Sequence, residues 1–154
     1  MKRVIAVELA DRLLRLGRHV PFALQRRVIE LATARLLAEP LTRGEFGLLQ
    51  GHWLQLEVED LGLSWFVTCV GRRLRVAPEA VADVRVRGNW REFVLLASRE
   101  EDPDTLFFRR RLVIEGDTDM GLGLKNLLDS LDPEHLPPRL WRGLQRAGQL
   151  LQQV

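Results

Sequence analysis

The apolar positions at the start of the chain recur every three or four residues, which is the period of an α-helix. This spacing predicts two amphipathic helices, over residues 3–16 and 22–38, with Gly17 ending the first and Pro21 opening the second. A broad apolar stripe suits a helix packed on a domain and also a helix lying on a membrane, so both placements stay open.

From residue 52 the pattern changes to alternation, which is the period of a β-strand. The predicted strands cover residues 52–60, 63–70, 73–76 and 82–87. The second strand is apolar on both faces, as a central strand would be. The connections are too short for crossovers, which predicts antiparallel pairing. A helix over residues 90–98 follows, with Asn89 as its N-cap.

The stretch 104–128 predicts a strand that turns directly into a helix. Residues 107–115 alternate, Gly116 breaks the alternation, and Asp117 or Thr118 can cap a helix that runs to about residue 131. Prolines interrupt the chain after this helix. A last amphipathic helix is predicted over residues 139–152.

Gly121 and Gly123 are unusual in the interior of a helix, because each costs about 1 kcal/mol relative to alanine. Two explanations are open. The helix packs closely on the sheet at these glycines, or an apolar ligand lies across them.

The run of three arginines at residues 109–111 lies inside the predicted strand. If the neighbouring apolar residues face the core, alternation places Arg109 and Arg111 in solvent and Arg110 inside. An inward arginine needs either a salt bridge to a nearby carboxylate or an anionic headgroup at the mouth of a cavity.

These elements favour an α+β fold with a five-stranded, mostly antiparallel sheet covered on one face by helices. A chain of 154 residues suits one globular unit with a core of its own. We expect residues 1–40 to form N-terminal amphipathic helices, residues 41–132 to form the sheet-containing domain, and residues 133–154 to form a C-terminal amphipathic helix.

Charge is unevenly distributed along the chain. Residues 1–44 carry nine basic and four acidic side chains, whereas residues 45–119 carry ten and fourteen. The basic side chains at the start are Lys2, Arg3, Arg12, Arg15 and Arg18. Such a cluster suits an anionic membrane or nucleic acid, and an ordinary solvated helix face is the plain alternative.

The sequence contains no Gly-x-Ser-x-Gly, Walker A, His-Glu-x-x-His or GxGxxG motif. His19, His52 and His135 lie far apart and have no ligand partner at metal-binding spacing. Cys69, the single cysteine, lies in the most apolar strand, as an inert buried thiol would. We therefore expect no catalytic residue, no metal and no cofactor. No apolar run approaches the roughly 18–20 residues that span a bilayer.

Four stretches resemble the bacterial UbiT (YhbT) family of SCP2 sterol-carrier-type lipid-binding proteins. They are residues 20–26, 46–53, 60–66 and 102–122. The resemblance implies an SCP2-like fold with an apolar tunnel between sheet and helices. It also implies a non-catalytic accessory factor of oxygen-independent ubiquinone biosynthesis, which presents hydrophobic quinone precursors to hydroxylases, with the UbiU and UbiV proteins as partners.

The residues expected to line the tunnel are Leu54, Leu56, Trp65, Val67, Trp90, Phe93, Arg110, Leu112, Ile114, Leu122 and Leu124. A packed core would use the same residue types. The expected ligands are quinone precursors or other prenyl or acyl lipids. The basic N-terminal residues are expected to contact an anionic membrane rather than nucleic acid. A cytoplasmic protein associating reversibly with the inner membrane would have these properties.

Two other classes of function stay open. Asp117 and Asp119 could hold Mg²⁺ against a diphosphate in an enzyme acting on a prenylated aromatic, although helix capping explains both acids. The basic helices could instead hold an acidic partner in an interaction module that binds no lipid. A general lipid carrier without a quinone role is the third possibility.

Overall fold

Five strands form one sheet in the order β3-β2-β1-β4-β5 in the computed structural model, which describes residues 1–133 and 136–152. The strands are β1 (Leu54–Val58), β2 (Leu63–Val70), β3 (Arg73–Ala77), β4 (Val84–Gly88) and β5 (Leu112–Gly116). All neighbours are antiparallel except β1 and β4. The expected α+β fold with a mostly antiparallel five-stranded sheet is confirmed.

The pairing of β4 differs from the antiparallel pairing expected from the short connections. β4 lies parallel to β1, with Val84 opposite Leu54, and β3 pairs with β2. The connecting residues 78–83 reach about 20 Å when extended, which is enough to pass the two intervening strands at about 4.8 Å a spacing. The backbone N–H of Asp83 then donates to the carbonyl of Trp53 at 2.9 Å, which sets the parallel register.

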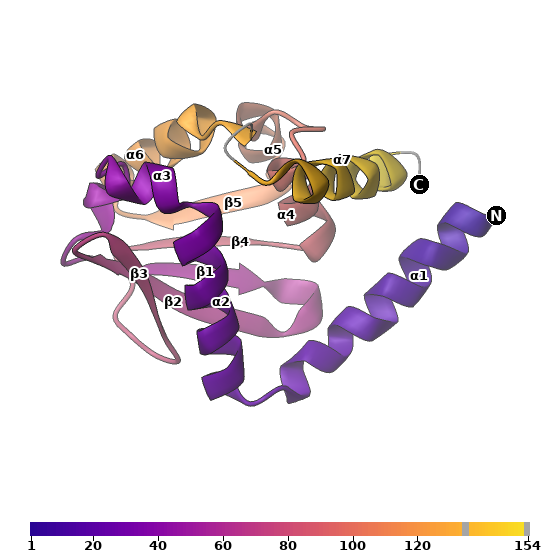
Figure 1. Cartoon of the computed structure of the whole chain (residues 1–154), viewed down its shortest axis with the longest axis horizontal. Helices are drawn as coiled ribbons and strands as arrows, with labels where there is room; N and C mark the ends of the chain where they lie inside the picture. The colour runs from indigo at the N-terminus through magenta and orange to yellow at the C-terminus, as the bar shows by residue number, and fades with distance from the viewer. Residues whose placement is uncertain (134–135, 153–154) are drawn as a thin grey trace.

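Seven α-helices accompany the sheet in the described residues (Figure 1). They are α1 (Lys2–Arg15), α2 (Phe22–Leu36), α3 (Ala38–Thr42), α4 (Trp90–Ala97), α5 (Pro103–Phe108), α6 (Thr118–Ser130) and α7 (Pro138–Gln152). Short 3-10 turns are η1 (Leu16–His19), η2 (Gly47–Leu49) and η3 (Glu59–Leu61). Pro40 lies in the first turn of α3. The helix tolerates it there, because the first N–H groups of a helix have no partner within the helix.

The strand predicted to begin at Phe107 begins at Leu112, so the first part of that prediction is wrong. Residues Pro103–Phe108 form α5 instead. Pro103 occupies the start of this helix and Asp104 lies in its first turn, both of which favour helix initiation.

The inner face of the sheet is apolar and packs against the helices. The register places Leu54, Val67 and Val76 side by side, and Leu56, Val86 and Ile114 in a second row. α2 packs along β3, and α6 packs along β5 at the other edge. Figure 1 shows α2 crossing the front of the sheet. The core of the protein lies in this layer.

The outer face of the sheet carries a ladder of opposite charges. Arg87 bonds Glu115 at 2.8 Å and Glu59 at 3.1 Å, while Arg85 pairs with Glu57. The bond from Arg87 holds the pKa of the Glu115 carboxyl below its ordinary value. This face is therefore a solvated, ion-paired surface.

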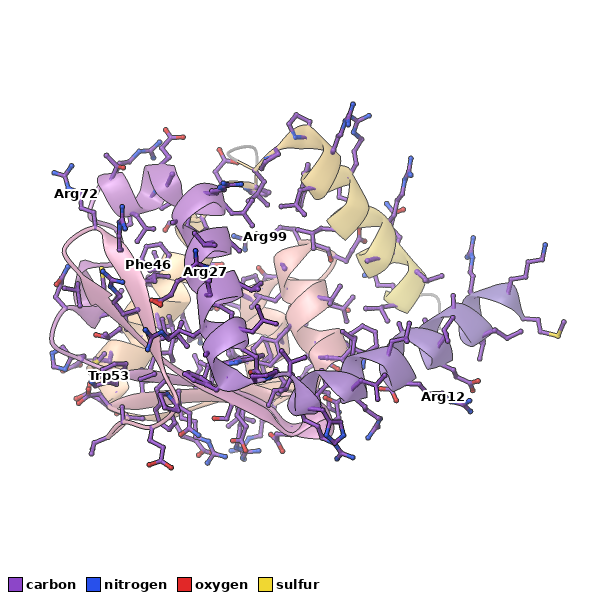
Figure 2. All side chains as sticks on the ribbon, turned by 60° about the horizontal axis from the view of Figure 1, so that its bottom comes forward. Arg12, Arg27, Phe46, Trp53, Arg72 and Arg99 are labelled. Atoms are coloured by element: carbon purple, nitrogen blue, oxygen red, sulfur yellow. The ribbon has the colours of Figure 1, made fainter. Side chains whose placement is uncertain are left out.

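α7 packs against α4 through a glycine. Gly148 is buried, and a Cβ added there would lie 2.1 Å from Ser98 Oγ and 2.6 Å from Glu100 Cγ. Only glycine allows this approach. The C-terminal end of α7 also contacts α1, which runs out from the body of the molecule (Figure 2).

Candidate functional site

The structure brings six of the residues expected to line a tunnel to the inner face of the sheet. Leu54 lies opposite Val67, and Leu56 lies opposite Trp65. Leu56 also lies opposite Val86 of β4, which in turn lies opposite Ile114. Leu112 lies on the same face at the end of β5 and is fully buried. These side chains make one continuous apolar surface under the helices.

The space above this surface is filled by side chains. Leu54, Val67 and Leu124 belong to the buried core cluster. Leu56, Trp65, Phe93 and Ile114 pack against it. In the conformation described, the expected wall of the tunnel is a packed core, so the tunnel stays a prediction.

Leu122 and Leu124 lie on opposite faces of α6. Leu124 is 5% exposed, whereas Leu122 is 58% exposed. Leu122 borders an open hollow of about 290 Å³ with Ile114, Gly121 and Lys125. A ligand in the core layer would meet Leu124 and not Leu122.

The two glycines of α6 have different roles. A Cβ at Gly121 would lie 3.1 Å from Ile114 Cγ2, so this glycine lets the helix pack closely on the sheet. Nothing lies within 4 Å of the corresponding position at Gly123. Close packing therefore explains the first glycine and does not explain the second.

Trp65 is hydrogen-bonded to Gln25 in the first turn of α2. Its indole Nε1 donates to Gln25 Oε1 at 2.8 Å. The Gln25 amide nitrogen in turn donates to the carbonyl of Val20 at 2.8 Å and to that of Gly17 at 3.3 Å. Gln25 thus ties the sheet surface to the chain that connects α1 to α2.

Trp90 makes the corresponding bond to α1. Its indole Nε1 donates to Asp11 Oδ1 at 2.9 Å, and Arg15 Nε donates to Asp11 Oδ2 at 2.9 Å. The bond from Trp90, followed by the bond from Arg15, lowers the pKa of the Asp11 carboxyl. Asn89 is the N-cap residue of α4, as predicted, but its side chain makes no capping bond. The Trp90 backbone N–H donates instead to Asp60 Oδ1 at 3.0 Å.

Gln25 and Asp11 are the site residues that the sequence pattern missed. Each bonds a tryptophan that lies 40 or 79 residues further along the chain. Asp11 stands on the inner side of its helix beside Val7, and its polarity among apolar positions is the one local signal.

The apolar stripe of α1 faces away from the domain. Val7 is the buried residue of this helix, at 2% exposure. The stripe residues are more than half exposed, and they are Ile5, Leu9, Leu13 and Leu16. A helix docked on a domain in the usual way would bury these residues.

α2 repeats this arrangement on the helix that crosses the sheet. Phe22 and Ile29 pack on the core, while Leu24, Val28 and Leu31 are each more than half exposed. Arg27 lies near them in sequence and is also exposed (Figure 2). Two consecutive helices therefore present unpartnered apolar stripes.

The basic side chains expected to contact a membrane lie along α1 and η1. Lys2, Arg3, Arg12, Arg15 and Arg18 are all exposed. Arg15 is paired with Asp11. Figure 2 shows Arg12 on the part of α1 that extends from the body.

The inward orientation expected for Arg110 is wrong. Arg110 is exposed and follows α5, because the strand does not extend to this residue. Arg111, which was expected in solvent, is the partly buried arginine and pairs with Glu92 at 2.8 Å and Glu101 at 3.3 Å. The predicted salt bridge to a nearby carboxylate is therefore made by Arg111 and not by Arg110.

The residues considered for other chemistry have structural roles. Asp117 Oδ1 accepts from the N–H of Met120 at 2.9 Å, which is the predicted cap of α6. Burial raises the pKa of the Cys69 thiol. Within residues 1–133 and 136–152, no three histidine, cysteine or acidic side chains are grouped to hold a metal, and His135 lies outside these residues.

None of the helices over the described part of the chain is both long and apolar enough to cross a membrane.

Comparisons with known proteins agree with this architecture. The profile of the SCP-2 sterol transfer family matches residues 30–129. The ubiquinone biosynthesis accessory factor UbiT of Escherichia coli strain K12 is 44% identical over 120 residues, which cover 78% of this chain and 69% of that protein. The UbiT proteins of two further E. coli strains, CFT073 and O157:H7, match equally well.

A solved structure shares the fold. It carries the description UbiJ-SCP2 ubiquinone synthesis protein, and it superimposes with a TM-score of 0.57 at 24% identity. The match covers 71% of this chain and 97% of that one.

Proposed function

The chain belongs to the UbiT family and contains an SCP-2 domain, and on this premise we propose that it is a non-catalytic accessory factor of oxygen-independent ubiquinone biosynthesis. It binds prenylated quinone precursors, and also phospholipid, in the apolar layer between sheet and helices. It presents the precursors to hydroxylases, with the UbiU and UbiV proteins as functional partners.

The continuous apolar inner face of the sheet is the observation that supports this proposal. Each buried methylene contributes about 0.8 kcal/mol, so a polyprenyl tail needs apolar surface more than polar recognition. Leu56, Trp65 and Ile114 supply such surface, and they line the core without belonging to its fully buried cluster. A ligand can therefore meet them once the covering helices move.

α1 and the turn after it are the part of the cover that can move at least cost. α1 buries one residue, Val7, and is tied to the domain by the bond from Trp90 to Asp11. The turn that follows is held through Gln25, which accepts from Trp65 and donates to the carbonyls of Gly17 and Val20. Opening this cover breaks few contacts and exposes the two tryptophans to the ligand.

Tryptophan fluorescence tests quinone binding, because a quinone ring quenches a nearby indole. Delipidated protein is titrated with a prenylated benzoquinone. Saturable quenching is expected, and it should be lost in Trp65→Phe/Trp90→Phe. The matched control, Trp53→Phe/Trp141→Phe, should keep most of it. Absence of quenching in the native protein would argue against a quinone ligand.

We also propose that α1 and α2 contact an anionic membrane, from which a carrier must collect its cargo. Their exposed apolar stripes run beside basic side chains, and each basic residue near such a surface contributes about 1 kcal/mol. α7, which contacts α1, adds Arg139, Arg142 and Arg146 around an open hollow of about 300 Å³. Attachment is weak, reversible and salt-sensitive.

A further inference from the structure

The end of α5 forms a protruding tip made of Phe108, Arg109 and Arg110. Phe108 is 90% exposed, and both arginines are exposed. Over the described residues, neither arginine side chain has an ion pair or a hydrogen bond. The fold makes no use of these three side chains.

The backbone conformation at Arg110 is strained for any residue with a side chain. The N–H of Arg111 donates to the carbonyl of Leu106 at 2.9 Å, and the N–H of Arg110 donates to that of Phe107 at 3.1 Å. This is the Schellman arrangement that ends a helix, and its left-handed position is usually glycine. Arg110 occupies that position with a φ of 57°.

Arg99 provides an internal comparison, because it has the same backbone conformation at the end of α4, with a φ of 59°. Its guanidinium donates to the carbonyl of Leu131 at 2.7 Å and also to that of Leu128, so it caps the end of α6. The strain at Arg99 therefore serves the fold. At Arg110, by contrast, the side chain makes no ion pair or hydrogen bond within the described residues that would offset the strain.

The tip lies at the edge of the sheet opposite α2, one of the helices proposed to meet the membrane. α5 packs on β5 and α2 packs on β3, which are the two outer strands of the sheet. Four strand spacings separate these edges, or about 19 Å. Figure 1 shows α2 at the front and α5 further back. The tip and α2 therefore lie at opposite edges of the sheet.

We propose that Phe108, Arg109 and Arg110 dock into a protein partner that offers an apolar pocket rimmed by carboxylates. Aromatic residues and arginine are enriched at protein interfaces, where a few buried anchors supply most of the binding energy. Phe108 fills the pocket, and the arginines pair with the carboxylates. The proposal rests on the proposed function in one respect, since delivery of a bound lipid requires a receiving protein.

A photocrosslinker at residue 108 tests the contact without assuming the function. Phe108→p-benzoylphenylalanine is introduced in the full chain in cells, with Val81→p-benzoylphenylalanine as the control, because Val81 is equally exposed at 89%. We expect one protein adduct at residue 108 and none at residue 81. Arg109→Glu/Arg110→Glu should abolish it, and the crosslinked partner peptide should be flanked by acidic residues. A lipid adduct, no adduct, or an adduct insensitive to charge reversal overturns the proposal.

Complementation then links the contact to function. Phe108→Ser and Arg110→Gly are expressed in a strain that lacks this protein, grown without oxygen. If the native protein restores ubiquinone, both variants should restore at least fivefold less, while Val81→Ser restores it fully. Full restoration by both variants overturns the docking proposal. If the native protein does not restore ubiquinone, the proposed function fails, and the crosslinking result alone decides whether the tip docks.

Discussion

Asp11 joins α1 to the domain, because it accepts the hydrogen bond from Trp90 of α4. Asp11→Ala should leave the domain folded and loosen α1. Limited proteolysis should then cut the segment 16–20 faster than in the native protein. Glu8→Ala, which changes an exposed acid on the same helix, is the matched control and should have no effect. Equal cleavage of both variants would mean that the Trp90 bond does not hold the helix.

The same bond predicts a pH dependence. The pKa of Asp11 is lowered in the folded protein, chiefly by the bond from Trp90. Its contribution to docking is therefore complete above the ordinary pKa of a carboxyl and is lost as the pH falls through the lower folded-state value. Cleavage of the native protein should stay constant down to about pH 5 and rise only in stronger acid.

Leu122 and Leu124 should respond very differently to truncation. Leu124 lies in the core cluster, so Leu124→Ala should lower the free energy of unfolding by about 2–5 kcal/mol. Leu122 is 58% exposed, so Leu122→Ala should change it by no more than about 0.5 kcal/mol. Denaturant unfolding measures both values. Similar costs would show that α6 is rotated from the orientation described.

The two left-handed arginines predict opposite effects of glycine. Arg110→Gly should raise the free energy of unfolding by about 1 kcal/mol, because glycine accepts this conformation without strain. Arg99→Gly should lower it by about 1–3 kcal/mol, because the carbonyls at the end of α6 lose their donor. Thermal unfolding of the two variants separates these outcomes, and a gain in both would remove the structural role given to Arg99.

Local chemistry was predictable at single residues, and long-range pairing was not. The cap by Asp117 follows from its position directly before a helix, and the structure confirms it. The bond between Asp11 and Trp90 joins residues 79 apart, and it depends on where α1 lies relative to α4. No pattern in the chain marks that geometry.

At the scale of elements, the outward stripe of α1 predicts membrane attachment through apolar contact as well as charge. Leu9→Ser/Leu13→Ser should weaken binding to vesicles rich in anionic lipid without altering the fold, since both leucines are more than half exposed. Val70→Ser is the matched control, because Val70 is 59% exposed on the sheet. Sedimentation at low and high salt measures binding. Undiminished binding by the leucine variant would contradict a membrane role for the stripe.

Strong periodicity identified the elements correctly, and weak periodicity did not. β2 was predicted with the bounds Leu63–Val70 that it has, because eight residues of apolar strand allow little else. Residues 107–115 alternate well enough to resemble one strand, yet Pro103 and Asp104 start a helix that runs to Phe108, and the strand begins only at Leu112. Helix initiation at a proline outweighed a short run of alternation.

At the scale of the whole molecule, the order of the strands was beyond local patterns. The parallel pairing of β1 with β4 depends on a connection that passes two strands. The apolar inner face was nevertheless predictable, because alternation assigns faces whichever strands are neighbours. That is why six of the expected lining residues share one surface although the pairing was partly wrong.

Native mass spectrometry of the purified full chain tests the central claim most directly. A carrier with an apolar layer and a movable cover should keep its lipid ligand bound through purification. We predict a complex of one chain with a prenylated quinone or precursor. Denaturation should release this ligand, whose mass then identifies it. The protein should be purified from cells that make ubiquinone. If it is then free of lipid, or carries only acyl lipids, the claim is contradicted.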